Sequence, residues 1–188
     1  MKLNQTLRVL NYRIQFYISF YKTSNKRTIG IYDICSDSKH VLFLDYDKFR
    51  LDWLENELRW LQKTFILSDF IILESSEGSY HAVCFDKFDL YQHHKIIQTT
   101  NVDEAFRNAP RWDYGSRVLR VLPKGKTRKP KYITTIYSKH NLRLKSNAHL
   151  KFFKHHYDIP FLNNENNDGL GKVYLIDYPT KKNIKGEK

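Results

Sequence analysis

The chain has few cysteines: only Cys35 and Cys84 occur in 188 residues. The two stand far apart, each within an apolar run, and the sequence contains no CxxC pair. Domains built on structural zinc or on a disulfide framework need more cysteines at closer spacing. We therefore expect no zinc, and the cysteine usage is typical of a protein in a reducing compartment.

Long hydrophobic runs are also missing. The first residues, MKLNQTLRVLNYR, are interrupted by polar side chains every few positions, and no apolar stretch approaches the length of a membrane span. The sequence therefore predicts neither a signal peptide nor a transmembrane helix, and it favours a cytoplasmic protein with no membrane partner.

Acidic residues are outnumbered. The chain has 32 Lys+Arg against 20 Asp+Glu, a formal net charge of +12, and 41% of its residues are apolar. The apolar fraction is enough for a folded core, and the length suits one domain with a small appendage. The charge favours a polyanionic partner, with nucleic acid as the first candidate. The alternative is a basic protein without such a partner.

The spacing of apolar residues indicates an alternation of strands and helices. It predicts strands at residues 12–21, 27–35, 40–47, 69–76, 80–86, 116–124 and 132–137, and helices at 49–65, 88–98, 102–109 and 146–159. From residue 41 to residue 124 the order is strand, helix, strand, strand, helix, strand. That order is typical of the split βαβ of ferredoxin-like and RNA-recognition-motif folds.

The expected fold class is therefore α+β, an RRM-like (ferredoxin-like split βαβ) sheet with helices on one face and extensions at both ends. We expect an N-terminal extension of strands and basic residues packed on the core (1–38), an RRM-like core (39–126), and a C-terminal extension with a frayed tail (127–188).

Two acids end the strand VLFLDYD. Asp45 and Asp47 are two residues apart, so both point to the same face of a strand. Two neighbouring carboxylates repel unless a cation lies between them, and Mg²⁺ or Mn²⁺ prefers such oxygen ligands. The alternative is that Asp47 caps the following helix and Asp45 faces solvent.

Polar and basic residues occur on the later strands as well. Ser79 and His81 share a face by the same spacing, and in a split βαβ sheet their strand lies beside that of the two acids. Further along, Arg120 lies within the apolar run VLRVL, where a buried guanidinium needs a carboxylate or phosphate partner. Lys124 shares its side of the strand, whereas Arg117 would face the other side.

Taken together, these residues resemble the archaeo-eukaryotic primase superfamily, which includes the primase-polymerases. LFLDYD is similar to the family's first motif, hhhDhD, and SYH is similar to its second, S-x-H. Val102–Asp103 is similar to the third, an acid after an apolar residue, although its flanks are polar and equally typical of a helix start. The resemblance covers roughly residues 39–126.

The resemblance implies template-directed nucleotidyl transfer by a primase, with two Mg²⁺ or Mn²⁺ ions. The ions would be held by Asp45, Asp47 and Asp103, and His81 would be catalytic. If Asp103 only starts a helix, two acids remain and the two-ion site is in doubt.

The other implied roles concern substrate. Nucleotide phosphates would be bound by Ser79, His81, Arg117, Arg120 and Lys124. Template would be held by the basic loop residues Lys126, Arg128, Lys129 and Lys131. The implied partners are single-stranded DNA, nucleoside triphosphates and a replicative helicase, in a nucleoid-associated, viral or plasmid (mobile-element) replication complex.

Two other interpretations remain open, and a third, histidine chemistry, is not favoured. The sheet could be a catalytically degenerate module that binds single strands or acts in replication initiation. The same acids with Mg²⁺ could serve a nuclease. The adjacent pairs His93–His94 and His155–His156 diverge on a helix and form no joint site, so we interpret them as solvated or DNA-facing.

Overall fold

The computed structural model describes residues 2–9, 12–19, 23–108, 116–123, 128–159 and 174–181. The strands are β1 Lys2–Val9, β2 Tyr12–Ser19, β3 Thr23–Tyr32, β4 His40–Tyr46, β5 Phe70–Ser76, β6 Ser79–Phe88, β7 Val118–Arg120, β8 Lys131–Ile136 and β9 Leu175–Lys181. The helices are α1 Leu51–Phe65, α2 Leu90–Gln98, α3 Glu104–Asn108 and α4 Asn147–Tyr157. The chain is therefore α+β, as expected. Among these helices, none has the length and apolar character needed to cross a membrane.

The central element is a four-stranded antiparallel sheet in the order β4-β6-β5-β8. The predicted first and third strands, β4 and β6, pair directly, and Asp45 lies opposite His81 in their register. The predicted fourth strand, β7, does not join this sheet and pairs with β3 instead. In the described residues β4 is thus an edge strand of the four-stranded sheet and not one of its two central strands.

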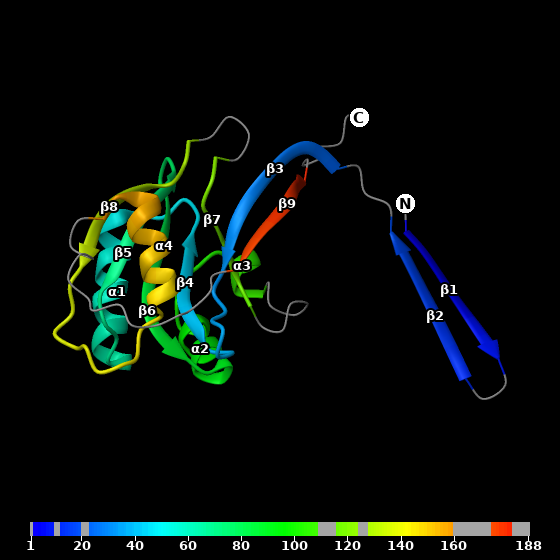
Figure 1. The fold of residues 1–188 in the computed structure, drawn as a ribbon, viewed down its shortest axis with the longest axis horizontal. Helices are drawn as coiled ribbons and strands as arrows, with labels where there is room; N and C mark the ends of the chain where they lie inside the picture. The colour runs from blue at the N-terminus through cyan, green and yellow to red at the C-terminus, as the bar shows by residue number, and fades with distance from the viewer. Residues whose placement is uncertain are drawn as a thin grey trace.

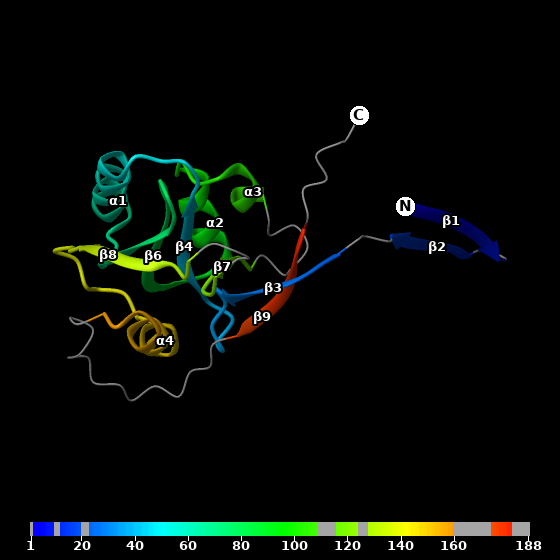
Figure 2. The ribbon, with the colours of Figure 1, turned by 90° about the horizontal axis from the view of Figure 1, so that it is seen from above.

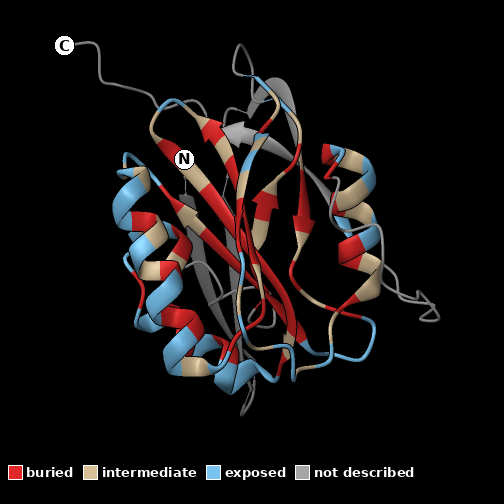
Figure 3. Cartoon of the chain, turned by 90° about the vertical axis from the view of Figure 1, so that its left-hand side faces the viewer, coloured by how far each residue is buried: buried red, intermediate tan, exposed pale blue. Residues whose placement is uncertain are grey.

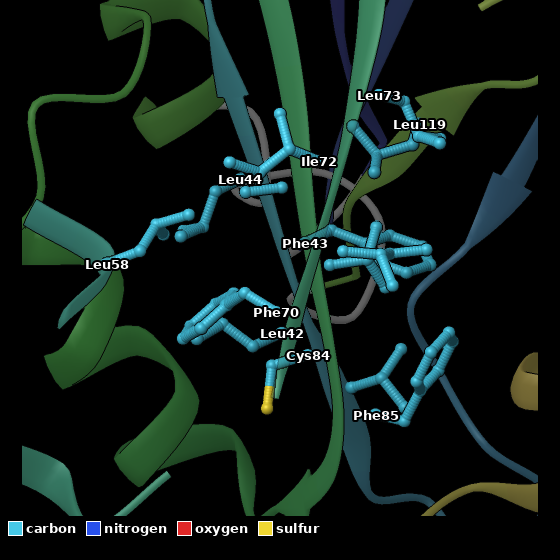
Figure 4. Close-up of a cluster of buried hydrophobic side chains, with 14 of the residues drawn as sticks. Leu42, Phe43, Leu44, Leu58, Phe70, Ile72, Leu73, Cys84, Phe85 and Leu119 are labelled. Atoms are coloured by element: carbon cyan, nitrogen blue, oxygen red, sulfur yellow. The ribbon is translucent and has the colours of Figure 1, made fainter. Parts of the chain in front are cut away.

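One face of this sheet packs on α1 and α2. Leu54, Leu58 and Leu61 recur at helical spacing on α1 and are fully buried. Figure 4 shows Leu58 pointing toward Leu44 on the same side of the strands. The helix begins without a side-chain cap at Arg50, whereas the Oδ1 of Asp89 caps α2 by accepting from the Gln92 backbone N–H at 2.7 Å.

The other face is covered in part by α4. The rings of Phe43 and Phe85 both contact that of Phe153, at centroid distances of 5.9 and 5.6 Å. Figures 2 and 3 show α4 and α1 on opposite sides of the sheet. The expectation of helices on one face therefore holds for α1 and α2 only. Because both faces are covered, the β4 residues from Val41 to Leu44 are all buried.

The chain ends form two smaller sheets. In one, β3 lies between β7 and β9, and Ile31 of β3 belongs to the core. In the other, β1 and β2 pair only with each other, from Lys2↔Ser19 to Val9↔Tyr12, and Figure 1 shows this hairpin extending from the body. The expected packing of residues 1–38 on the core therefore applies to β3. In the C-terminal tail, residues 179–181 belong to β9 and residues 182–188 lie outside the described part.

Candidate functional site

Asp45 and His81 meet at the end of β4 and β6. The register places them opposite each other, and His81 Nε2 lies 3.5 Å from Asp45 Oδ1. His81 is 3% exposed, while the side chain of Asp45 is 36% exposed. Burial, aided by the charge of Arg120, lowers the pKa of His81 to about 3, so the imidazole is neutral at pH 7.

The second nitrogen of His81 carries the more informative observation. Its Nδ1 is buried and has no hydrogen-bond partner. A buried polar atom without a partner costs about 1–3 kcal/mol, and such atoms are rare in native folds. His81 therefore has the capacity to form one more hydrogen bond, to a group that the described residues do not provide.

Asp47 and Ser79 form the neighbouring cross-strand pair. The Ser79 hydroxyl donates to Asp47 Oδ1 at 2.6 Å and accepts from the backbone N–H of Lys48 at 3.2 Å. Asp47 is exposed, and Lys48 takes a left-handed backbone conformation with φ 50°. A non-glycine residue in this region is strained by about 1–3 kcal/mol, and such strain is found most often at functional sites. Ser79 thus fixes both the acid and the turn that follows it.

Arg120 is the last residue of β7 and lies beside this site. Its guanidinium donates to the carbonyl oxygens of Ser75 at 2.7 Å, Leu122 at 3.3 Å and Arg128 at 3.4 Å. The positive charge of Arg120 is close enough to His81 to lower the pKa of the imidazole. Arg120 therefore contributes positive potential near His81.

Asp103 lies near the acids but has a structural role. Its backbone N–H donates to the Asp45 carbonyl oxygen at 2.8 Å, and its Oδ1 accepts from the Phe106 backbone N–H at 3.0 Å. It is thus the N-cap of α3, the alternative that its polar flanks indicated. Within the described ranges, Asp45, Asp47 and Asp103 do not form a group whose ligand atoms all lie within 4.8 Å of one another.

Arg117 lies elsewhere, in a buried cluster that we name the Asp33 cluster: Asp33, His40, His93 and Arg117. All four residues are 2% exposed or less. The cluster adjoins the start of β4, because the Val41 backbone N–H donates to the Asp33 carbonyl oxygen. At the rise of a strand, this is about 13 Å along β4 from Asp45. Arg117 therefore does not join Arg120 at a shared phosphate site, contrary to the expected role.

The contacts within the Asp33 cluster link three elements. The Arg117 backbone N–H donates to Asp33 Oδ1 at 2.9 Å, and its Nη1 donates to His93 Nδ1 at 3.4 Å. His40 Nδ1 and His93 Nε2 each lie 3.3 Å from an Asp33 oxygen. Burial raises the pKa of Asp33 and lowers that of His93. Asp33 and Arg117 carry opposite charges, so the cluster is internally balanced.

Asp33, His40 and His93 form the one group of three or more potential metal ligands that lie within 4.8 Å of one another in the described residues. Their contacts argue against a metal there. A guanidinium has no acceptor, so His93 Nδ1 must accept from Arg117, and the proton of the neutral ring is then on Nε2, the atom that faces Asp33. A protonated nitrogen cannot ligate, and the guanidinium would repel a cation. We interpret the cluster as structural.

Two of the described loop cations bind the protein itself. Arg128 forms an ion pair with Glu74. Lys129 donates to the His156 carbonyl oxygen and lies over the ring of Tyr157 at 5.0 Å. Lys131 is exposed on β8, whereas Lys124 and Lys126 fall outside the described residues. Of the described cations predicted to hold template, Lys131 is thus the one whose exposed side chain forms no ion pair or hydrogen bond with another described residue.

The histidine pairs divide between core and surface. His94 and His155 are exposed, as interpreted from the sequence. His93 is fully buried, and His156 is half-buried, with its Nε2 donating to the Val121 carbonyl oxygen at 3.0 Å. The interpretation of these two as solvated was wrong. The sequence signal that could have placed His93 was its helical spacing to the buried Ile96 and Ile97.

Comparisons with protein-family models, with curated proteins and with solved structures give no match for this chain. The candidate site therefore rests on its own geometry: two acids, a serine and a neutral histidine from β4 and β6, with the charge of Arg120 beside them.

Proposed function

We propose that this site performs metal-dependent nucleotidyl transfer of the primase type on a single-stranded template. The observation that carries the proposal is the unpartnered Nδ1 of His81, buried beside Asp45 and Arg120. A neutral imidazole nitrogen and a guanidinium are suited to a triphosphate oxygen, and two acids nearby are suited to its counter-ion.

The fold supports the same proposal. The order β4-β6-β5, with α1 and α2 on one face, is that of the first three strands and two helices of an RRM-like split βαβ. Asp45 and Asp47 lie on the opposite face, beyond the part covered by α4. The primase-like motifs thus occupy neighbouring strands with a common face.

Each residue has a separable role. Asp45 and Asp47 would hold Mg²⁺ or Mn²⁺, which neutralises the triphosphate and activates the attacking hydroxyl when bound. Ser79 positions Asp47 through its hydroxyl, and His81, in the tautomer with its proton on Nδ1, would donate one hydrogen bond to a phosphate oxygen. Arg120 offsets phosphate charge. Positioning of the two reactants and stabilisation of the charge on the triphosphate would supply the rate enhancement, with no covalent intermediate on the protein.

The proposal is tested by incubating the protein with a single-stranded template, labelled nucleotides and Mn²⁺. The double variant Asp45→Asn/Asp47→Asn should lose product by about 100-fold or more, because the charge-neutralising ligands are gone. Asp52→Asn is the matched control, since Asp52 is an exposed acid that pairs with Arg50 on α1. Synthesis that survives the double substitution would refute the proposal, and degradation of the input strand would identify a nuclease.

A second candidate is a primase-like module that binds single strands without catalysis. The observation that favours it is the use of Asp103 as the cap of α3, which leaves two acids for metal. In that case the wild-type chain yields no product with Mg²⁺ or Mn²⁺ but retains affinity for single-stranded DNA, and the Asp45→Asn/Asp47→Asn variant binds at least as tightly.

A further inference from the structure

The outer face of α1 exposes two tryptophans. Trp53 is 57% exposed and Trp60 is 48% exposed, although tryptophan is usually well buried in a folded domain. They are seven residues apart, which is two turns, so they lie on one side of the helix. Figure 1 shows α1 at the outside of the fold, away from the β1–β2 hairpin. This face is therefore an aromatic surface that the described residues leave exposed.

Both indoles are held in place by their neighbours. The ring of Phe49 meets that of Trp53 edge-on at 6.4 Å, and the ring of Phe65 meets that of Trp60 edge-on at 6.2 Å. Edge-to-face contacts of this kind hold the two rings in a defined orientation. Rigid aromatic rings lose little conformational entropy when a ligand binds, so they are efficient contact residues.

The outer side of α1 carries charges of both signs. The Arg50 guanidinium lies 5.1 Å from the Trp53 ring and donates two hydrogen bonds to Asp52. Glu57, half-buried between the tryptophans, accepts from the Tyr46 hydroxyl and from Asn101. Arg59 and Lys63 are exposed on this side, and neither forms an ion pair with a described residue. These two cations are therefore the groups on α1 that could pair with phosphates.

The face is also continuous with the candidate site. Asp47 is followed by Lys48, Phe49 and Arg50, and α1 then begins at Leu51. Trp53 is therefore six residues from Asp47. The two tryptophans lie about 10 Å apart along the helix axis, close to three times the 3.4 Å spacing of stacked nucleotides in one strand.

We propose that the outer face of α1 is a second binding surface, on which single-stranded nucleic acid stacks its bases on Trp53 and Trp60 and pairs its phosphates with Arg59 and Lys63. The combination of stacking rings and cations is the recognition mode for single strands without sequence preference. This surface goes beyond nucleotidyl transfer, because binding there needs neither metal nor triphosphate.

The experiment measures the fluorescence anisotropy of a labelled 20-nucleotide oligothymidylate with the full chain in EDTA. Each of Trp53→Ala and Trp60→Ala should raise Kd at least about fivefold, and the double variant more, given the loss of base stacking. Arg59→Ala/Lys63→Ala should reduce the dependence of log Kd on log salt. The control is Tyr91→Ala on α2, whose ring is 77% exposed and which should bind as the wild type does.

Trp53→Phe and Trp60→Phe are conservative variants that distinguish loss of binding from loss of fold. Each keeps an aromatic ring at its position and should therefore retain part of the affinity. Circular dichroism checks each variant. An unchanged Kd in the folded double variant overturns the proposal. If the double substitution changes the sedimentation coefficient of the protein but not its Kd for the oligonucleotide, the face is a protein interface and the proposal is wrong. Asp45→Asn/Asp47→Asn should bind normally, so failure of catalysis and failure of this surface are distinguishable.

Discussion

Replacing Arg117 by methionine tests whether the charge of this guanidinium stabilises the buried Asp33 carboxylate. Arg117 is 1% exposed, and its side chain contacts His93 and the Arg107 carbonyl oxygen at 3.4 and 3.2 Å. Methionine fills a similar volume but removes the positive charge that lowers the pKa of Asp33. Leaving a buried carboxylate without a compensating charge costs up to about 3–5 kcal/mol. For a chain of this size, such a loss lowers Tm by about 10 °C.

The assay is urea denaturation followed by circular dichroism, with Arg50→Met as the control on an exposed arginine. Asp33→Asn/Arg117→Met should recover part of the loss, because removing both charges leaves no unpaired ion. If Arg117→Met lowers the free energy of unfolding by less than about 1 kcal/mol, the guanidinium is solvated and the cluster does not hold β3, α2 and β7 together.

Two further predictions concern stability. Burial holds the pKa of His81 at about 3 and that of His149 at about 4, below their ordinary 6.5, so the unfolded chain binds protons first as the pH falls. Each residue should therefore lower the free energy of unfolding by up to about 1.4 kcal/mol per pH unit below pH 6.5. The urea midpoint, measured between pH 7 and 5, reports this loss. His149→Gln should weaken the pH dependence, and substitution of the exposed His94 by Gln should not. Ile66 ends α1 in a left-handed conformation at φ 54° and is 47% exposed, so Ile66→Gly should stabilise the protein by about 1 kcal/mol, and a lower Tm would contradict this.

Elements with strong periodicity were predicted well from the sequence. Residues 49–65 carry leucines at helical spacing, and the observed α1 is Leu51–Phe65. The helix predicted at 146–159 is observed at Asn147–Tyr157, with Ser146 at the N-cap position but without a side-chain cap bond. In both cases the apolar stripe that defines the helix is also what it buries, so local pattern and tertiary structure agree.

The strand pairings between distant segments could not be predicted from the sequence. β7 has three residues, too few for their apolar pattern to identify a partner strand. It pairs with β3, and Asp33 accepts from the Arg117 backbone N–H immediately before the strand, a contact across 84 residues. The alternation of side chains and the expected strand order placed Asp45 and His81 on neighbouring strands, but no pattern in the sequence distinguishes a metal ligand from a helix cap at Asp103.

The shortest strand of the fold has an arginine just before it and another as its last residue. Arg117 is enclosed by protein, whereas Arg120 is half-buried beside the two acids. A screen that scores only loss of the proposed activity would recover both positions and group them as one motif. The two would nevertheless differ in kind, since Arg117 is enclosed in the structural cluster and Arg120 lies at the proposed site.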